Sequence, residues 1–342
     1  MNTLHIVMIL ASFGAAMAGV FVWRSIALRF DIVAIANNRS LHVGRIPVGS
    51  GIVFAVVWLA TIACAYAAGW VGTSDFLALF IGGVVLAALG LHDDATDSPA
   101  LTRLLVHIIV VTPGLVWIGG FPAIPVFGYT VDLGWFGYVI GFLAGLWMIT
   151  LINFMDGVDG MLASGAIVIS VAMGTFLHLE GDTVLSVLLY SLAAGLCGFL
   201  WFNWPPAKIF MGDAGSTFLG YVFFMLILIT TREHPDLFWV WMIVLGYFFT
   251  ETTLTLVLRL MYLTTFRDLY KPHRDHAYQS LARRTENHLL VTRTVLMIEV
   301  FWLLPMAALA YSQPNLAMVV FIASITPVGI FVAKQGVFHA LR

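Results

Sequence analysis

The sequence predicts an all-α polytopic membrane protein, folded as one domain over residues 1–342 with about eleven transmembrane helices. Hydrophobic residues make up 61% of the chain and charged residues only 10%, whereas about a quarter of an ordinary soluble domain is charged. Apolar runs of about 17 or more residues, long enough to cross a bilayer as helices, recur along the whole chain. Within lipid these runs must be helical, because each has to satisfy its own backbone polar groups.

The predicted helices follow one another with short connections, and the sequence contains no large soluble domain or clear internal repeat. The first apolar run begins almost at Met1 and has no basic segment before it, so we expect a retained span and not a cleaved signal peptide. In chain order, the spans are expected at about residues 4–23, 49–69, 76–92, 103–120, 136–152, 161–178, 184–202, 215–231, 237–262, 293–312 and 316–333.

The basic residues predict the orientation of these spans. With eleven crossings the connecting segments form two sets. One set holds fifteen of the sixteen Lys and Arg residues, and the other holds only Arg232. Basic residues gather on the cytoplasmic side of membrane proteins. We therefore expect a periplasmic N-terminus and a cytoplasmic C-terminus.

Four polar clusters interrupt the apolar pattern, and all four fall on the predicted cytoplasmic side. Carboxylates cost several kcal/mol in or near hydrocarbon, so their gathering at one depth predicts a site that holds a metal ion or a phosphate. The segments expected to form this site are about residues 24–48, 92–103, 153–160, 203–216 and 263–292.

The first cluster is the adjacent pair Asp93 and Asp94. Two neighbouring carboxylates repel one another and resist joint ionisation unless a cation is near, which favours metal or phosphoryl-transfer chemistry. The alternative is a solvated loop in which Asp97 or Ser98 caps the next helix. Arg103, which opens the next span, is either a phosphate contact or an anchor at the membrane interface.

The second cluster, NFMDGVDG at residues 153–160, spaces Asn153, Asp156 and Asp159 three residues apart. If the preceding helix continues through them, they share one face. An amide and two carboxylates on such a face suit Mg²⁺, which prefers oxygen ligands. The alternative is that the glycines of this segment end the helix in a turn.

The third cluster, MGDAGS at residues 211–216, leads into an apolar helix. Asp213 and Ser216 are both candidates for the N-cap of that helix. A glycine-rich turn at a helix N-terminus also offers backbone N–H groups to an anion, and Asp213 could add a metal ligand. Capping and ligand binding do not exclude one another here.

The fourth cluster, HRDHAYQ at residues 273–279, lies in the most basic connecting segment. His273, Arg274 and His276 make a compact set for binding phosphate, and the acidic clusters on the same side favour a substrate pyrophosphate. The alternative is a basic loop that contacts anionic lipid headgroups.

Other polar residues fall outside these clusters. Residues 37–51 (NNRSLHVGRIPVGSG) precede the second span and either line a nucleotide pocket or anchor that span. Glu251 and Glu299 lie inside predicted spans, so each is expected to face the interior of the bundle, where a charged group can find partners.

Taken together and in this order, the clusters resemble those of the polyprenyl-phosphate N-acetylhexosamine-1-phosphate transferase superfamily. An Asp pair followed by NxxDGxDG and GDxGS carries the resemblance, which extends over nearly the whole chain. The HRDHAYQ form is more similar to the bacterial enzymes that initiate O-antigen synthesis than to the peptidoglycan enzyme, whose corresponding loop is a run of histidines. The chain departs from the pattern at residues 44–51, where Val48 replaces a common Arg, and at His107, which replaces the usual Gln.

The resemblance implies catalytic and metal-binding roles for matching positions. Catalytic roles are implied for Asp93, Asp94 and Asp156, of which the first two would activate the lipid phosphate. Binding of Mg²⁺ is implied for Asn153 and Asp213.

The resemblance also implies which residues bind substrate. Arg103 would contact phosphate, and Asp159 would recognise uracil. The donor pyrophosphate and sugar would be held by His273, Arg274 and His276.

The implied reaction is transfer of N-acetylhexosamine 1-phosphate from a UDP-sugar to undecaprenyl phosphate with release of UMP, the first membrane step of O-antigen or other cell-surface polysaccharide synthesis. The implied partners are UDP-N-acetylhexosamine, undecaprenyl phosphate and membrane lipid, without nucleic acid, and a homodimer is compatible with the resemblance. The implied cofactor is Mg²⁺, with Mn²⁺ as an alternative. The implied location is the bacterial inner membrane, with a cytoplasmic active site.

Several alternatives stay open at this point. The sugar is open among GlcNAc, FucNAc and QuiNAc, and the reaction is either direct or passes through an aspartyl-phosphate. A peptidoglycan-type phospho-N-acetylmuramoyl-pentapeptide transferase is the closest alternative enzyme. A secondary transporter of an anionic solute is the alternative from another class, although transporters place polar groups near the bilayer midplane and often contain inverted repeats.

Overall fold

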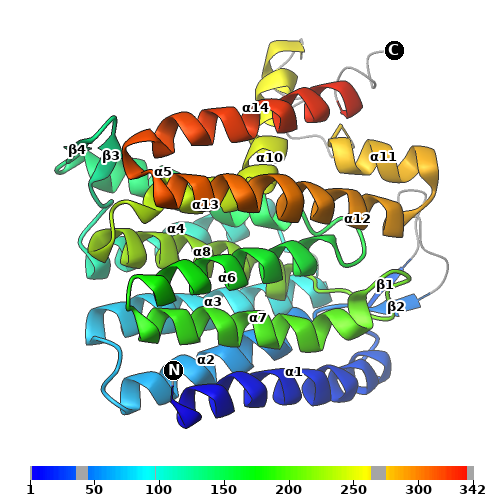
Figure 1. The fold of residues 1–342 in the computed structure, drawn as a ribbon. Coiled ribbons are helices and arrows are strands. Elements are labelled where there is room, and N and C mark those ends of the chain that lie inside the picture. The colour runs from blue at the N-terminus through cyan, green and yellow to red at the C-terminus, as the bar shows by residue number, and fades with distance from the viewer. Residues whose placement is uncertain (1, 36–44, 97, 263–274, 337–342) are drawn as a thin grey trace.

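The structure, a computed structural model, describes residues 2–35, 45–96, 98–262 and 275–336, and its helices lie side by side in one bundle (Figure 1). The helices of the first half are α1 (Thr3–Arg29), α2 (Gly51–Ala67), α3 (Thr73–Thr96), α4 (Ala100–Ile118), α5 (Phe136–Phe154), α6 (Met161–Leu179) and α7 (Thr183–Asn203). Those of the second half are α8 (Asp213–Glu233), α9 (Leu237–Val244), α10 (Gly246–Tyr262), α11 (Ala277–Thr285), α12 (His288–Ile298), the π-helix η2 (Glu299–Leu303), α13 (Leu304–Ser312), the short 3₁₀-helix η3 (Pro314–Leu316) and α14 (Ala317–Gln335).

Two small antiparallel hairpins add to the helices. One pairs β1 (Val33–Ile35) with β2 (Arg45–Pro47), and the other pairs β3 (Ile124–Val126) with β4 (Tyr129–Val131). The sequence analysis predicted neither, because strands of three residues leave almost no periodicity to detect. They lie in connections, so the all-α class holds for the bundle itself.

The predicted spans correspond closely to the helices. In the part of the chain that the structure describes, nine helical runs are long and apolar enough to cross a membrane, α2 is apolar but shorter, and α9 with α10 qualifies only as a bent pair. Each predicted span falls on one of these. The chain is therefore an all-α multi-pass membrane protein, while the number of crossings and the orientation stay predictions.

The predicted span at 237–262 is not one straight helix. It breaks at Leu245 into α9 and α10, which meet at an angle of 69°. Gly246 lies at the break, and glycines are common where helices bend sharply. The break matters for the site, because Glu251 of α10 is fully buried and contacts the start of α11.

Helix α8 lies at the centre of the bundle and is buried along its length. Its sequence is apolar on all sides, as expected for a helix surrounded by other helices. Helices α3 and α5 both pack closely against it. Since α8 begins at Asp213, the helix carries its first turn to the end of the bundle where the polar clusters lie.

The polar clusters gather at one end of the bundle, the end that carries β1, β2 and α11 in Figure 1. The opposite end carries a different ion pair, in which Arg232 donates to both oxygens of Asp75 at 3.0 and 2.9 Å. The prediction that the clusters share one end is therefore confirmed. Several predicted loop residues are nevertheless helical, because α1, α3 and α5 run further than the predicted spans.

Candidate active site

The end of α3 and the start of α8 touch at two glycines. A Cβ on Gly90 would lie 2.4 Å from the backbone nitrogen of Ala214, and one on Gly212 would lie 2.4 Å from an oxygen of Asp94. Gly212 also has a φ of +74°, which side-chain-bearing residues rarely adopt. These positions therefore allow the Asp pair on α3 to reach the first turn of α8.

Asp94 caps α8 from a neighbouring helix. Its carboxylate accepts hydrogen bonds from the backbone N–H groups of Asp213 at 2.9 Å and Ala214 at 3.2 Å. A helix N-terminus carries unpaired N–H groups and partial positive charge, which a carboxylate stabilises. The expectation that Asp213 or Ser216 caps this helix is wrong, since the N-cap position is Gly212 and the Ser216 hydroxyl donates to the Gly212 carbonyl.

Asp93 has different partners from its neighbour. Its side chain is buried, with one oxygen accepting from the Ser98 backbone N–H at 2.6 Å and the other from Arg103 at 2.8 Å. The same Arg103 nitrogen lies 3.4 Å from Asp213. Arg103 therefore bridges two acids from α3 and α8 and partly neutralises their charge.

Asp156 lies in a turn and not on a helix. Helix α5 ends at Phe154, so the prediction that Asn153, Asp156 and Asp159 share a helical face is wrong and the glycine-turn alternative is correct. Burial raises the pKa of Asp156 well above its usual value, and the charges of Asp213 and Asp94 raise it further. The Gly212 N–H acts in the opposite direction. Asp156 is therefore a neighbour of the cluster at the start of α8.

The donor set of this cluster fits a hard divalent cation. Electrostatic interactions link four carboxylates, from Asp93, Asp94, Asp156 and Asp213, and two of them, Asp93 and Asp213, contact the guanidinium of Arg103. Among the described residues of this cluster, carboxylates therefore outnumber cationic groups, and carboxylate oxygens are the ligands that Mg²⁺ prefers. Among the described residues no group of three or more His, Cys, Asp or Glu side chains is arranged to hold a metal ion by itself. Any cation here would therefore need further ligands, such as substrate phosphates and water.

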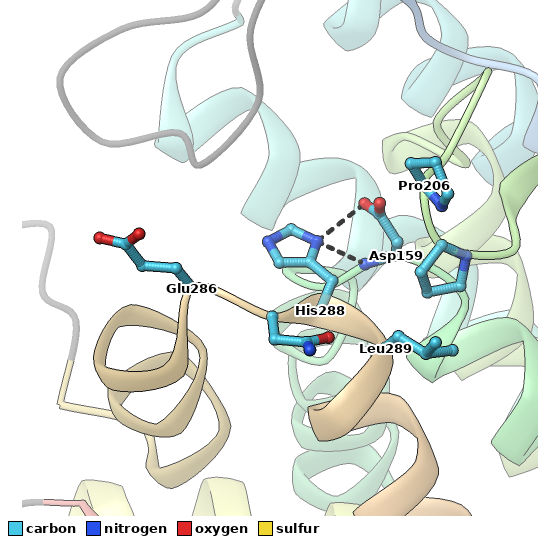
Figure 2. A pocket seen from close by; sticks show the side chains of 7 residues that line it. Asp159, Pro206, Glu286, His288 and Leu289 are labelled. Atoms are coloured by element: carbon cyan, nitrogen blue, oxygen red, sulfur yellow. Dashed lines mark hydrogen bonds and ion pairs between the residues drawn. The ribbon is translucent and has the colours of Figure 1, made fainter.

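Asp159 lines a separate cavity beside the cluster (Figure 2). The cavity has a volume of about 290 Å³ and is bounded by Asp159, Pro205, Pro206 and residues 286–289. One Asp159 oxygen accepts from the Ala207 backbone N–H at 2.9 Å, and the other lies 3.0 Å from Nδ1 of His288. The volume is near the small end of the range for ligand pockets.

His288 is a residue that the sequence analysis missed. It opens α12, directly after the N-cap Asn287, and lies 129 positions from Asp159 in the chain. No local pattern marks such a pairing. The nearest available signal was the N-cap, because an Asn before an apolar run indicates where a helix begins.

His276 lies at the start of α11 and pairs with Glu251. Its Nδ1 is 2.7 Å from one Glu251 oxygen, and the backbone N–H of Ala277 donates to the other at 2.7 Å. The Tyr278 hydroxyl donates to the carbonyl of Phe154, so α11 is fixed against the end of α5. The expectation that Glu251 faces the interior is confirmed.

Other predicted residues stand as follows. His273 and Arg274 lie outside the described residues, so their roles stay predictions. Residues 45–51 do reach the site, because Ser50 donates its hydroxyl to the Phe210 carbonyl at 2.7 Å, next to the start of α8.

Comparison with known proteins adds independent evidence. The model of glycosyl transferase family 4 matches residues 76–231, a range that contains the Asp pair and the second and third polar clusters. A probable undecaprenyl-phosphate N-acetylglucosaminyl 1-phosphate transferase of Bacillus subtilis is 29% identical over 80% of this chain and 76% of its own length. These matches support the polyprenyl-phosphate hexosamine-1-phosphate transferase superfamily, which the polar clusters of this chain resemble.

Other relatives of this superfamily cover less of the chain. A decaprenyl-phosphate N-acetylglucosaminephosphotransferase of Mycobacterium leprae is 32% identical, over 62% of this chain and 56% of its own length. A phospho-N-acetylmuramoyl-pentapeptide-transferase of Kosmotoga olearia is 42% identical over 28% of this chain and 29% of its own. The resemblance predicted from the four polar clusters is thus confirmed at the level of the superfamily.

Proposed function

We propose that this transferase moves an N-acetylhexosamine 1-phosphate from a UDP-sugar to undecaprenyl phosphate and releases UMP. An oxygen of the lipid phosphate bonds to the β-phosphorus of the donor, and the bond from that phosphorus to the oxygen bridging the α-phosphorus breaks. The sugar phosphate then stays on the lipid as a diphosphate. The observation that carries the proposal is the group of four carboxylates, two of them in contact with Arg103, beside a cavity of about 290 Å³.

The residues of the site have different roles: some position other groups, some bind the substrates, and one acts on the lipid phosphate. Asp94 fixes the start of α8, which sets where Asp213 lies. Asp93, beside Arg103, deprotonates or orients the lipid phosphate, and Arg103 can exchange one of its two acids for an incoming phosphate oxygen. Asp159 and the cavity beside it receive the uridine part of the donor. His276 with its loop holds the donor pyrophosphate.

A divalent cation would complete the site. Mg²⁺, or Mn²⁺ in its place, would be held by Asn153, Asp213 and the donor pyrophosphate, and when bound it neutralises charge on the leaving phosphate. The charge excess of the carboxylate cluster supports this assignment. Asp156 adds negative charge next to these ligands and is a further candidate catalytic acid.

The biological setting is also part of the proposal. With the eleven predicted spans, fifteen of the sixteen Lys and Arg residues fall on the side of the polar clusters, which supports a cytoplasmic active site in a bacterial inner membrane. The product would enter O-antigen or another cell-surface polysaccharide. The two N-acetylglucosaminyl relatives favour GlcNAc as the sugar, with FucNAc and QuiNAc as the other candidates.

A second enzyme candidate has a specific observation behind it. The relative from Kosmotoga olearia supports a peptidoglycan-type transferase that acts on phospho-N-acetylmuramoyl-pentapeptide. Its match covers only 28% of this chain, whereas the Bacillus subtilis match covers 80%. The longer match favours the N-acetylhexosamine donor. A transporter is disfavoured, because the cluster of Asp93, Asp94, Asp156 and Asp213 lies at one end of the bundle, whereas transporters place their substrate sites near the bilayer midplane.

The test is release of UMP by the purified protein in detergent with undecaprenyl phosphate and a panel of donors: UDP-GlcNAc, UDP-FucNAc, UDP-QuiNAc and UDP-N-acetylmuramoyl-pentapeptide. We expect activity with one N-acetylhexosamine donor, its loss in EDTA, and its return with Mg²⁺. Asp213→Ala should remove most turnover, while Asp75→Ala at the opposite end serves as the control. Full activity in EDTA or in Asp213→Ala would contradict the metal assignment, and no release from any donor would contradict the reaction.

A further inference from the structure

Tyr278 lies where the first turn of α11 meets the turn that follows α5. Its side chain is buried, and its hydroxyl donates to the carbonyl of Phe154, the last residue of α5. The side-chain amide of Gln279 donates to the same hydroxyl at 3.2 Å. The hydroxyl is therefore a donor and an acceptor at once, and these two contacts fix its orientation.

The bond to Phe154 continues the hydrogen bonding of α5 beyond its last turn. The final carbonyls of a helix lack N–H partners within the helix. Here the backbone N–H of Asp156 donates to the Asn153 carbonyl at 3.2 Å, and the next carbonyl, that of Phe154, accepts from Tyr278. A side chain 124 positions away in the chain therefore helps to fix where the turn begins.

Gly157 leaves the space that this hydroxyl occupies. A Cβ on Gly157 would lie 2.6 Å from the Tyr278 hydroxyl oxygen and 2.9 Å from a carbon of its ring. Both contacts are much closer than the roughly 3.5–4.0 Å at which carbon atoms normally pack. The turn over residues 154–157 therefore curves around the hydroxyl, with a hydrogen bond at its start and a close packing contact at its end.

The same turn carries two residues of the proposed reaction. Asn153, the proposed cation ligand, directly precedes the carbonyl that Tyr278 holds, and Asp156 follows that carbonyl by two positions. The carboxylate of Asp156 accepts from the backbone N–H of Gly212 at the start of α8. Tyr278 is an electrostatic neighbour of Asp156 on the side of α11. Asp156 therefore lies between two fixed points, one on α8 and one on α11.

Tyr278 also adjoins the residue that we propose to hold the donor pyrophosphate. Its ring centroid lies 5.6 Å from that of the His276 imidazole, and the Phe154 ring lies 5.7 Å from the same imidazole. Glu251 contacts this histidine and accepts from the first backbone N–H of α11. The hydrogen bond between Tyr278 and Phe154 therefore joins the segment of the proposed donor contact to the turn that follows the proposed cation ligand.

We infer that Tyr278 is a positioning residue for the transfer reaction: its hydroxyl holds Asn153 and Asp156 in place for the cation and the donor, and does not itself touch substrate. This inference rests on the proposed function, which gives those two residues their roles. A displacement of about 1 Å can lower a rate by about 10²-fold, even when its cause lies far from the reacting atoms. The alternative is that the bond only attaches α11 to the bundle, so that its loss lowers stability and leaves the reaction unchanged.

Tyr278→Phe, in the full-length protein in detergent, removes the hydroxyl and keeps the buried ring. UMP release is measured against varied Mg²⁺, and binding of Mn²⁺ in the presence of UMP is measured by electron paramagnetic resonance, which needs no turnover. We expect kcat to fall by at least about tenfold, because the turn is no longer held in place. The Mg²⁺ concentration for half-maximal rate should rise, and the affinity for Mn²⁺ should fall, each by at least about threefold, since one buried hydrogen bond is lost.

Gly157→Ala perturbs the same contact from the other side. The added methyl would displace the Tyr278 hydroxyl from the turn, so the Mg²⁺ dependence should shift in the same direction. In the double variant with Tyr278→Phe, the atom nearest to this methyl is gone. The combined effect should therefore be smaller than the product of the two single effects. Single effects that multiply without coupling would contradict a shared contact.

The matched control is Tyr221→Phe. The Tyr221 hydroxyl is also buried and donates to a backbone carbonyl, that of Ala78 at 2.7 Å, but it joins α8 to α3 in the interior of the bundle. This variant should lose stability as Tyr278→Phe does, and keep the wild-type Mg²⁺ dependence and Mn²⁺ affinity. The inference is overturned if folded Tyr278→Phe keeps the wild-type kcat and Mg²⁺ dependence, or if Tyr221→Phe shifts both equally.

Two further outcomes are distinguishable from these. If Tyr278→Phe does not fold, Gly157→Ala decides the question by the same two measurements, and wild-type values in that variant would overturn the inference. A wild type that releases no UMP from any donor, or that keeps full activity in EDTA, would instead count against the proposed function.

Discussion

The carboxylate of Asp94 accepts the backbone N–H of Asp213 at 2.9 Å, so a side chain at the end of α3 caps the central helix α8. The adjacent carboxylate, Asp93, bonds instead to Arg103 and to the backbone at Ser98. The two acids of the pair therefore have different physical tasks. Asp94 fixes the geometry of the metal-ligand candidate Asp213, and Asp93 lies where it can act on a phosphate.

The first prediction tests the capping role of Asp94 through the stability of the protein. Asp94→Ala leaves two backbone N–H groups of α8 without their acceptor, so we expect a loss of about 1–2 kcal/mol in stability, the upper part of the range for a lost helix cap. Asp94→Asn keeps one acceptor oxygen and should lose less. Thermal unfolding in detergent measures both. Asp236→Ala is the control, because Asp236 occupies the N-cap of α9 without a side-chain bond.

Replacement of Asp93 by Asn should affect turnover more than stability. Asp93→Asn keeps the size and much of the hydrogen bonding but removes the charge, and kcat should fall by at least about 10²-fold, the lower limit for a general base. UMP binding should change little. Wild-type turnover in a folded Asp93→Asn protein would reduce Asp93 to a structural partner of Arg103.

The second prediction follows from the raised pKa of Asp156. A carboxyl whose pKa is higher in the folded than in the unfolded state stabilises the fold at low pH, and this contribution is lost as the pH rises through the two values. Asp156 therefore destabilises the metal-free protein at neutral pH relative to low pH, because burial and the charges of Asp213 and Asp94 disfavour its ionised form. Asp156→Asn should unfold at a higher temperature than the wild type at pH 8 in EDTA.

The difference in Tm should shrink as the pH is lowered toward about 4, the usual value for an unfolded Asp. The Asp156→Asn variant should also lose activity. Asp156 would then be a residue that lowers stability but is needed for function. A Tm difference that is equal at pH 8 and near pH 4, or one of opposite sign, would show that the environment of Asp156 does not disfavour its charge.

The third prediction concerns Glu251, which lies behind His276. Glu251→Ala would remove the carboxylate that accepts from the Ala277 N–H and contacts the His276 ring, at a cost of about 1–3 kcal/mol, and kcat/KM for the UDP-sugar should fall accordingly. Glu251→Gln retains an acceptor for Ala277 and should restore part of this loss. The split between KM and kcat, measured with varied donor, distinguishes loss of donor binding from general damage.

Glu299→Gln is the matched control for this pair. Glu299 is also a buried acid inside a membrane helix, but neither of its oxygens has a hydrogen-bond partner among the described residues. Its replacement should leave donor kinetics unchanged. If Glu251→Ala also had wild-type donor kinetics, the contact between Glu251 and His276 would only attach α11 to the bundle.

How far the sequence could predict this molecule depends on the range of the interactions. Membrane helices are local features of hydropathy, so the spans were predictable, and the motif at residues 153–160 marked the site because its acids interrupt apolar runs. The cap that joins Asp94 to Asp213 spans 119 positions, and the pair of Asp159 and His288 spans 129. Such contacts depend on how whole helices pack, which no local pattern records.

The break between α9 and α10 was also beyond sequence reasoning, for a different reason. Residues 237–262 satisfy the composition of one span, and Gly246 alone does not require a bend. The bend of 69° lies between α9 and α10. Beyond it, Glu251 of α10 accepts a hydrogen bond from the backbone N–H of Ala277, the first residue of α11. Composition alone therefore leaves the local structure at this position open.

The last prediction tests the orientation on which a cytoplasmic active site depends. The two native cysteines, Cys64 and Cys197, are exposed and should first be replaced by Ala. A single cysteine at Lys208, an exposed position just before α8, lies at the end of the polar clusters, and one at Ser74 lies at the opposite end beside Asp75. In intact spheroplasts an impermeant thiol reagent should label Ser74→Cys at once and Lys208→Cys only after the membrane is opened. Labelling in the reverse order would place the carboxylate cluster on the periplasmic side, where the basic residues do not normally gather.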